Sequence, residues 1–418
     1  RALLGREPDP YSLYFHLHRL RSGIPKVTVV ADLLQGAEAA ALISPAPPRD
    51  CHPTAWGYLV AQSQDPHFMQ EHFRAFILPD DPHPFEPKGF QPATRQLIVS
   101  HVHAATPDPF VAAIPGGRVW GKSGGIVNSS AVISPDNKVI WDVSSEFRNH
   151  PWEHPVFSGA AMPPAQYVPE TVALLHSPGC FNYYHWMFEV LPRFELLRLS
   201  GMPVDKYAIN RHIRQPFQEE TLAILGIPPE KIIDLSGHCQ LRAKKLVVTS
   251  LPGRQGYLPA WAGNFLRHHF VEKRGLRKKK GYERIYLSRS YAKHRHILNE
   301  AEVINMLGAR GFVALNTEFL SVAEQAEIFY SAEAIVAPHG AALTNIVFCD
   351  PGTKIIEIFP EHYQFPCFPP VCKHYRLDYY FLVGRGYPRA NHEWGVLAED
   401  MTINVDELRQ MLGFAGIV

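Results

Sequence analysis

The segment AIVAPHGAALTN (residues 334–345) places groups that can hold an anion at the end of an apolar run. A parallel strand followed by a helix leaves the free N–H groups and the positive dipole of the helix at the carboxyl edge of the sheet. The proline ends the strand, and Gly340 allows a close backbone approach. The small side chain of Ala341 leaves the start of the helix accessible, while His339 and Asn345 supply hydrogen-bonding groups. The pattern predicts an anion-binding turn, called the anion seat below, or alternatively a tight turn selected only for packing.

A second candidate is the basic segment SRSYAKHRH (residues 288–296), directly after the apolar run RIYL. Guanidinium groups bind phosphate oxygens through paired hydrogen bonds, so Arg289 and Arg295 are suited to a phosphorylated ligand. If both apolar runs are parallel strands, this loop lies at the same sheet edge as the anion seat. The two segments together indicate a diphosphate, and a solvated basic loop is the alternative.

The third candidate is CFNYYHWMFEVLPRFELLR (residues 180–198), which has the pattern of a helix capped by Asn182. His185 and Glu189 are separated by one helical turn, so the carboxylate can orient the imidazole as a base. A satisfied interior histidine and a plain Glu189–Arg193 ion pair are the alternatives. The proline within the segment predicts a kink or a break.

Glu357 is a carboxylate inside the apolar run KIIEIF and therefore needs partners. A ribose hydroxyl pair, an arginine of the basic loop or a purely structural group would each serve. The sequence lacks Asp-x-Asp, HExxH, GxxxxGK[ST] and G-x-S-x-G motifs. Their absence argues against a metal-chelated diphosphate, a zincin, a Walker P-loop and a serine hydrolase elbow.

The composition is that of an ordinary globular protein: 418 residues, 46% hydrophobic, 19% charged and a net charge of +1. This balance gives no reason to expect nucleic acid as a partner. No apolar run reaches the roughly 18 residues of a membrane span. The six cysteines form no zinc pattern, which favours reduced thiols in the cytosol, although Cys367 and Cys372 could bridge in an oxidising compartment.

Strand and helix patterns alternate twice along the chain, which predicts two α/β domains with parallel sheets and a cleft between them. A small hairpin-bearing sheet is expected at the head of the first domain. The expected order is a loop-rich extension (1–90), an acceptor-side Rossmann-like domain (91–258), a linker helix with a basic segment (259–282), a donor Rossmann-like domain (283–395) and a C-terminal helix (396–418).

The motifs NYYHWMFEVLPR, SRSYAKHRHILNE and APHGAALTNIVFCDPGTKIIEIFP resemble, in this order, glycosyltransferase family 61. The resemblance covers residues 172–360 and extends more weakly over 119–144. It implies two Rossmann domains in the GT-B arrangement, an inverting mechanism without a required metal or cofactor, and a nucleotide-sugar donor. The family commonly has glycine at the position of Ala342, so the chain departs from the pattern there.

The residue patterns, together with the resemblance, give expected roles. His185 is expected to be the catalytic base with Glu189 as its orienter or substitute. The residues expected on the donor diphosphate are Arg289, Arg295, His339, Gly340, Ala341, Asn345 and Glu357. Tyr291 and Phe319 are expected on the nucleoside side, and Asn182 and Tyr184 on the acceptor side.

The expected reaction moves a sugar from a nucleotide-sugar, in the first instance a UDP-sugar, to a hydroxyl of a glycan or glycoprotein. The alternative is a non-catalytic nucleotide-sugar-binding protein of the same fold. A cytoplasmic, bacterial-type location is expected, or the Golgi or ER lumen if an upstream anchor was removed.

Overall fold

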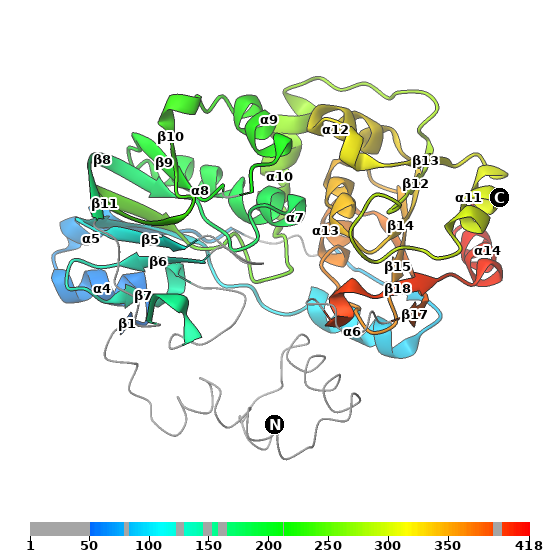
Figure 1. The fold of residues 1–418 in the computed structure, drawn as a ribbon, viewed down its shortest axis with the longest axis horizontal. Coiled ribbons are helices and arrows are strands. Elements are labelled where there is room, and N and C mark those ends of the chain that lie inside the picture. The colour runs from blue at the N-terminus through cyan, green and yellow to red at the C-terminus, as the bar shows by residue number, and fades with distance from the viewer. Residues whose placement is uncertain are drawn as a thin grey trace, which may run out of the picture. The chain divides into compact units, whose positions relative to one another are not determined.

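In the computed structural model, the chain is described over residues 51–78, 83–122, 129–144, 153–157, 165–211, 213–387 and 395–418. These residues form two compact units, each of which is described by itself (Figure 1). The described residues of the first unit come from 51–78 and 107–253, and those of the second unit from 83–106 and 254–418.

The strands of the first unit form one ten-stranded sheet. They are β1 (Cys51–His52), β2 (Phe73–Ala75), β4 (Phe110–Pro115), β5 (Arg118–Lys122), β6 (Ser129–Ile133), β7 (Val139–Ile140), β8 (Ala165–Leu174), β9 (Lys206–Ile209), β10 (Ile232–Asp234) and β11 (His238–Thr249). The sheet has the order β1-β7-β6-β5-β11-β8-β9-β10, while β4 pairs with β11 and β2.

Strand β11 joins a parallel half and an antiparallel half of this sheet. It pairs in parallel with β8, and β9 and β10 continue the parallel half. On its other side β11 pairs antiparallel with β5 along its first residues and with β4 along its last. The expected small hairpin sheet is therefore not separate. Because β11 is twelve residues long, it can accept two successive partners on one edge and merge the hairpin strands into the main sheet.

Helical segments pack against this sheet around one main apolar core. They are α4 (Ala55–Gln62), α5 (Pro66–His72), η1 (Trp141–Val143), η3 (Pro155–Phe157), α7 (Tyr183–His185), η4 (Trp186–Val190), α8 (Arg193–Ser200), α9 (Pro216–Ile224) and η5 (Pro229–Lys231). The core contains Leu59 from α4, Val172 from β8 and Leu246 from β11. Burial of these side chains is the main force that holds the sheet layer to its helices.

The second unit contains a six-stranded parallel sheet with the order β13-β12-β14-β15-β16-β3. Its strands are β3 (Lys88–Gly89), β12 (Arg284–Leu287), β13 (Val313–Leu315), β14 (Ala334–Pro338), β15 (Lys354–Phe359) and β16 (Asp378–Val383). The inner strands β14 and β15 are almost entirely buried, as expected for strands covered on both faces. The chain runs outward from β12 to β13 and then returns to β14, so strand order reverses between β12 and β14. Ligands of open parallel sheets bind at the carboxyl ends of strands at such a reversal.

The remaining elements of the second unit cover this sheet. They are α6 (Pro92–Val102), α10 (Ala260–Arg267), η6 (His268–Glu272), α11 (Glu300–Gly308), η7 (Thr317–Phe319), α12 (Val322–Ser331), η8 (Ala341–Phe348), α13 (Pro369–Tyr375), η9 (Gly395–Ala398), α14 (Val405–Phe414) and the antiparallel pair β17 (Arg385–Tyr387) and β18 (Asp400–Thr402). The predicted capping box at the start of α12 is confirmed, with Ser321 Oγ bonded to the Glu324 amide.

The expected boundary at residue 91 differs from the structure. Residues 83–106 belong to the second unit, where β3 pairs in parallel with β16 and α6 packs against α13. Gly89 makes this pairing possible, because a Cβ at this position would lie 2.4 Å from the ring of Phe381. The part of the expected extension over residues 1–50 lies outside the described residues.

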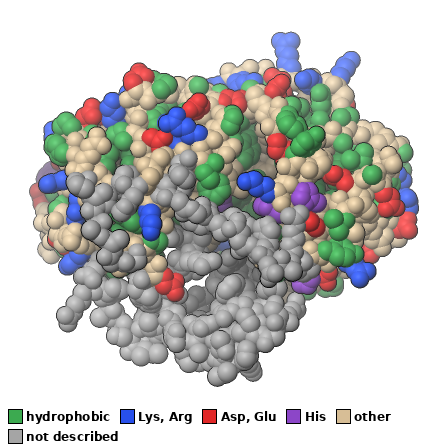
Figure 2. All heavy atoms as spheres, in the orientation of Figure 1, with side chains coloured by type: hydrophobic (Ala, Val, Ile, Leu, Met, Phe, Trp, Pro, Cys, Tyr) green, Lys and Arg blue, Asp and Glu red, His purple; other side chains and the backbone are tan. Residues whose placement is uncertain are grey.

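The surface view in Figure 2 shows acidic and basic side chains interspersed over the described part of the visible face. This agrees with the nearly balanced composition of the chain. Within the described ranges, no helix combines the length and the apolar character needed to cross a membrane.

Candidate functional site

Arg289 and Gly340 meet at the point where strand order reverses in the second unit. Arg289 follows β12, and Gly340 follows β14 and precedes η8. A Cβ built on Gly340 would lie 2.0 Å from Arg289 Nη1, so the absence of a side chain at 340 lets the guanidinium lie against the turn. The structure therefore brings the predicted basic loop and the predicted anion seat together.

The basic loop holds two guanidinium groups close to each other. Arg289 Nη2 donates to the His294 carbonyl at 2.9 Å, and Arg295 lies over the Tyr363 ring at 5.4 Å. Burial and the charge of Arg295 lower the pKa of Arg289, and burial lowers the pKa of Arg295. Two partly buried cations side by side destabilise each other until an anion binds between them or beside them.

The backbone of this loop is strained at Arg295, which has a φ of +61°. This left-handed conformation costs a non-glycine residue conformational free energy. It persists where contacts with the surrounding structure stabilise it, and it is often found at functional sites. The next residue stabilises this backbone: the amide of His296 donates to Asp400 Oδ1 at 2.8 Å, and its ring Nδ1 lies 3.0 Å from the same oxygen.

The expected helix after β14 is segment η8, a 3₁₀ helix over Ala341–Phe348. The first amides of a helix lack partners within the helix, so the start of η8 still presents donors at this edge. Asn345 is fully buried, and its Nδ2 donates to Gln325 Oε1 at 2.7 Å and to the Ala342 carbonyl at 3.1 Å. These contacts tie η8 to α12, which is a structural role.

His339 and Glu357 form a buried pair next to the guanidinium groups. His339 Nδ1 lies 2.6 Å from Glu357 Oε1, and the Tyr379 hydroxyl donates to Glu357 Oε2 at 2.6 Å. Burial, followed by the charges of Arg295 and Arg289, lowers the pKa of His339 well below 6.5. Burial raises the pKa of Glu357 to about 8. The hydrogen-bond partners that the structure shows for Glu357 are thus a histidine and a tyrosine, which corresponds to the structural alternative.

Tyr291 and Phe319, predicted on the nucleoside side, form an exposed aromatic pair. Their ring centroids are 4.8 Å apart at 84°, and about two thirds of each residue is accessible (66% and 67%). Exposed aromatic rings of this kind can stack on a planar base.

The first unit contains the predicted His185–Glu189 pair. His185 Nδ1 lies 2.9 Å from Glu189 Oε1, and the Ser177 hydroxyl donates to Glu189 Oε2 at 2.5 Å. Burial raises the pKa of Glu189, but the His185 ring and the Ser177 hydroxyl lower it by more, and the net pKa lies below 4.5. The arrangement holds an ionised carboxylate against the imidazole, so Nε2 of the ring can accept a proton.

The helical segment that carries this pair contains a wide turn and is interrupted at the predicted proline, after which α8 begins at Arg193. Segment η4 is a π-helix, in which the Leu191 amide donates to the Trp186 carbonyl at 3.0 Å. Pro192 follows directly and has no N–H to donate, so widening the preceding turn accommodates the interruption.

The two predicted acceptor-side residues have local roles. Asn182 caps the helix, because its Oδ1 accepts from the Tyr184 amide at 2.9 Å. Tyr184 is buried, and its ring meets His185 edge-on at 5.2 Å.

Ser177 and Gly179 were not predicted as site residues. Both lie in the turn after β8, at the carboxyl edge of the parallel half of the sheet. A Cβ on Gly179 would lie 2.4 Å from His185 Cδ2, so the imidazole packs directly on the glycine backbone. The available signal was their position between a buried strand and a helix, where polar residues and glycine often serve a site.

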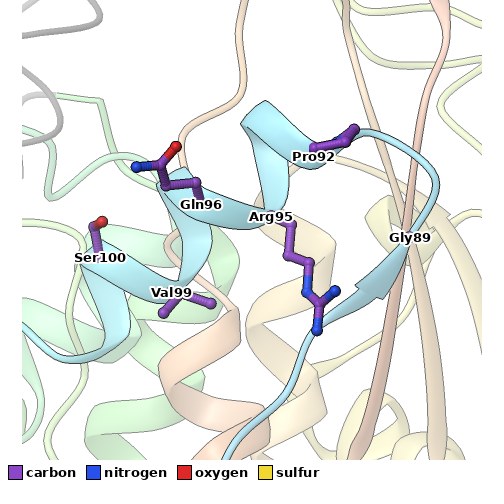
Figure 3. A pocket seen from close by; sticks show the side chains of 6 residues that line it. All are labelled: Gly89, Pro92, Arg95, Gln96, Val99 and Ser100. Atoms are coloured by element: carbon purple, nitrogen blue, oxygen red, sulfur yellow. The ribbon is translucent and has the colours of Figure 1, made fainter.

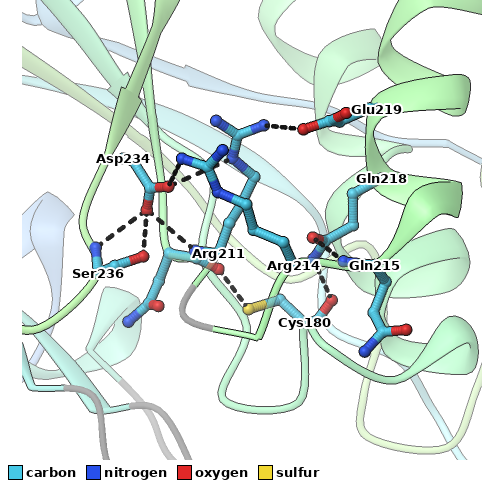
Figure 4. Close-up of polar contacts among 9 residues, drawn as sticks. Cys180, Arg211, Arg214, Gln215, Gln218, Glu219, Asp234 and Ser236 are labelled. Carbon is cyan, nitrogen blue, oxygen red and sulfur yellow. Dashed lines mark hydrogen bonds and ion pairs between the residues drawn. The ribbon is translucent and has the colours of Figure 1, made fainter.

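The same edge of the first unit carries a polar network that sequence reasoning also missed (Figure 4). Asp234, at the end of β10, lies 3.1 Å from Arg214 Nη2 and 3.8 Å from Arg211 Nε. Arg211 is also 4.0 Å from Glu219. Because carboxylates compensate both arginines, this cluster is a structural ion-pair network.

A pocket of about 320 Å³ lies in the second unit on β3 and α6 (Figure 3). It is lined by Gly89, Pro92, Arg95, Gln96, Val99 and Ser100. None of the predicted ligand residues is among its lining residues. Within the described residues, no group of three or more His, Cys, Asp or Glu side chains is arranged to hold a metal ion. Cys372 is a free thiol, so the bridge to Cys367 is not formed.

The predicted residues thus fall into two groups. His185, Glu189, Asn182 and Tyr184 lie in the first unit, and Arg289, Arg295, His339, Gly340, Ala341, Asn345, Glu357, Tyr291 and Phe319 lie in the second.

Comparison with known proteins gives a match to one family model and weak similarities to solved structures. No curated protein matches the chain. Among solved structures, the bacterial iron-containing dodecameric glycosyltransferase TibC from enterotoxigenic E. coli H10407 is similar with a TM-score of 0.25 and 9% identity, over 75% of this chain and 80% of that chain. This similarity is too low to carry a conclusion.

The family model for Glycosyltransferase 61 matches residues 183–356. The matched range includes the His185–Glu189 pair, the basic loop and the His339–Gly340 turn. These are the same segments on which the resemblance in the sequence rested. The match shows that this part of the chain is similar to glycosyltransferase family 61.

Proposed function

We propose that the chain is an inverting glycosyltransferase that moves a sugar from a nucleotide-sugar, in the first instance a UDP-sugar, to a hydroxyl of a glycan or glycoprotein. The contact of Arg289 with Gly340 carries this proposal, because it joins two predicted phosphate-binding segments at the strand reversal. The family supports glycosyl transfer. The identity of the donor, the inversion at the anomeric carbon and the identity of the acceptor are parts of this proposal.

In this proposal the donor lies on the second unit. Its diphosphate contacts Arg289, Arg295 and the amides at the start of η8, and its base lies near Tyr291 and Phe319. The guanidinium groups and amides stabilise the charge that develops on the leaving diphosphate, so that no metal ion is required for this role. Such donors accelerate the reaction because they bind the transition state more strongly than the substrate.

The first unit binds the acceptor hydroxyl, as a fold of the GT-B type implies. Nε2 of His185 takes the hydroxyl proton while the oxygen attacks the anomeric carbon from the face opposite the nucleotide. The bond from that carbon to the diphosphate breaks, and its electron pair leaves with the phosphate oxygen. Glu189, held by Ser177, orients His185 and stabilises the imidazolium that forms.

The alternative is a protein that binds the donor without turning it over. It shares the second-unit site but predicts no transfer and no donor hydrolysis. The deciding experiment incubates the purified chain with UDP- and GDP-sugars, with and without glycan acceptors, and measures released nucleotide and glycosylated product. A thermal-shift series with UDP, GDP and CMP runs in parallel, because a ligand bound only by the native state raises the melting temperature. Stabilisation with turnover supports the enzyme, and stabilisation with no turnover across the panel supports the binding protein.

A further inference from the structure

Glu357 is the most deeply buried carboxyl group next to the candidate donor site. It has no accessible surface, and both of its oxygens are hydrogen-bonded within the second unit. Oε1 lies 2.6 Å from His339 Nδ1, and Oε2 accepts from the Tyr379 hydroxyl at 2.6 Å. The number of protons on the Glu357–His339 pair decides whether Nε2 of the His339 ring carries a proton and donates a hydrogen bond, or presents a lone pair and accepts one.

The surroundings of the pair are aromatic. The His339 ring stacks on Phe359 at 5.3 Å, and the rings of Tyr363 and Phe368 lie at 5.3 and 5.6 Å. The side chain of His339 is 4% exposed. A buried pair with net charge is costly in such an environment unless a direct partner compensates it.

The charged and titratable groups around the pair are on several elements. Arg289 and Arg295 act on His339, and both disfavour an additional positive charge on the ring. Arg295 and the hydroxyl of Tyr379 favour ionisation of Glu357, but burial outweighs them and raises its pKa to about 8. Cys372 is also near Glu357, and burial raises the pKa of this thiol well above 9.0. The directions for Glu357 and His339 agree in favouring a pair without net charge.

We propose that Glu357 and Tyr379 are positioning residues that keep the Glu357–His339 pair neutral, with a proton on His339 Nε2 that is donated to an oxygen of the bound diphosphate. Protonated Glu357 donates to Nδ1 through Oε1, while Tyr379 donates to Oε2. The imidazole is then a neutral donor whose other nitrogen is occupied. With an ionised Glu357 and a neutral ring, Nε2 would instead present a lone pair and repel the anion.

The place of the ring supports this role. His339 directly precedes Gly340, against which Arg289 lies. Tyr363 meets the His339 ring edge-on and also lies under Arg295. Within the described residues, the hydrogen bond of the ring is made through Nδ1, which leaves Nε2 for a ligand. This inference rests on the proposed donor site, since it assigns a third donor to the same diphosphate.

The first test reads the proton directly. The chain has 22 histidines, so selective nitrogen-15 labelling is combined with the variant His339→Phe to assign the resonances of this ring. At about pH 7 we expect Nε2 to carry the proton in the wild type and in Glu357→Gln. The amide of Gln imitates a protonated carboxyl: its oxygen accepts from Tyr379 and its nitrogen donates to Nδ1. A neutral ring with its proton on Nδ1 and a bare Nε2 in the wild type overturns the inference.

The second test measures binding by calorimetry with UDP, GDP and inorganic pyrophosphate, the last as a probe without a nucleoside. Glu357→Gln should bind within about threefold of the wild type, because the donor on Nε2 is kept. His339→Phe should weaken binding about tenfold or more, because one hydrogen bond to a charged group is lost. A folded Glu357→Gln protein that no longer binds contradicts the inference.

The outcomes separate the two proposals. If none of the three probes binds the wild type but Nε2 carries the proton, the donor site fails and the protonation state stands. If the probes bind but Nε2 is bare, the donor site stands and the positioning role fails. The nitrogen-15 spectrum also shows whether each variant is folded, and Tyr379→Phe provides a second variant that leaves both His339 and Glu357 in place.

Discussion

Gly340 lies against the guanidinium of Arg289, and a methyl group at position 340 would stand 2.0 Å from Nη1. The backbone of Gly340 is extended, with φ near 174°, so any residue can adopt it. Glycine is therefore needed here for space and not for backbone freedom. The atom in the way is the end of a flexible side chain, so a larger residue would move Arg289 and leave the fold intact.

Gly340→Ala should consequently weaken binding of a nucleoside diphosphate by about tenfold, since it displaces one charge-assisted donor. The melting temperature should change little. The measurement is calorimetry with the nucleotide that stabilises the wild type. Gly308→Ala is the matched control, because Gly308 ends helix α11 and a Cβ added there would meet nothing within 4 Å. Equal affinity of Gly340→Ala and wild type would contradict the placement of Arg289 in the site.

Arg295→Lys should reduce the affinity for the same nucleotide by about thirtyfold, because an ammonium cannot reproduce a paired guanidinium contact. Lysine keeps the charge, so the loss separates geometry from net charge. The left-handed backbone at this position, with φ of +61°, is held by the contacts of His296 and stays unchanged in the variant. Wild-type affinity in Arg295→Lys would contradict a paired guanidinium contact and would show that Arg295 contributes only its positive charge.

His185→Ala should lower the rate of transfer by about a hundredfold or more, the usual contribution of a general base. Its affinity for the donor nucleotide should stay near that of the wild type, since the base acts on the acceptor. Initial rates and calorimetry on the same preparation check both statements. Wild-type turnover in His185→Ala would remove this residue from the mechanism.

Gly179→Ala tests whether the position of the imidazole matters. A Cβ at 179 would lie 2.4 Å from His185 Cδ2, and a rigid ring cannot absorb this overlap as a flexible chain would. Displacement of a catalytic group by about 1 Å can cost roughly a hundredfold in rate, so kcat should fall while donor affinity is kept. A variant that melts like the wild type and retains its kcat would show that the contact is only packing.

The pH dependence of nucleotide binding follows from the pKa of Glu357, which is raised to about 8. Below this value the pair with His339 is neutral and Nε2 carries a proton. As pH rises through about 8, the pair loses a proton, and the bond to the diphosphate is lost with it. The pKa values of Tyr379 and Cys372 are raised well above their usual values, so these groups do not titrate in this window. The pKa of Arg289 is lowered to about 9, above this window. As pH rises through about 8, affinity should therefore fall in the wild type and remain level in Glu357→Gln.

The same shift has a consequence for folding. An acid whose pKa is higher in the folded state than in the unfolded state binds more protons when folded, so stability declines as pH rises from 4.5 toward about 8. Glu189 has the opposite sign: its pKa is lowered, so the stability it contributes is present above 4.5 and is lost as pH falls through the lowered value.

Local patterns in the sequence were sufficient for the strand-and-helix alternation, the capping box at Ser321 and the motifs of the family. They also predicted the meeting of the Arg289 loop with the His339–Gly340 turn. That prediction needs only one general rule, since the carboxyl ends of parallel strands lie at the same edge of a sheet. The His185–Glu189 contact was likewise predictable, because residues one turn apart lie on the same face of a helix.

The features that could be predicted from the chain alone are therefore those that depend on neighbours along it or on the general geometry of a parallel sheet. Three others became visible only in the folded molecule: residues 83–106 join the second unit, Glu357 faces His339 and Tyr379, and Gly179 lies under His185. Each of these contacts is made between two segments that come close only because of the strand order of the sheet or the packing of a helix against a turn. The periodicity of apolar residues along a segment predicts which face of a helix or strand is buried, but it does not predict which other element packs on that face.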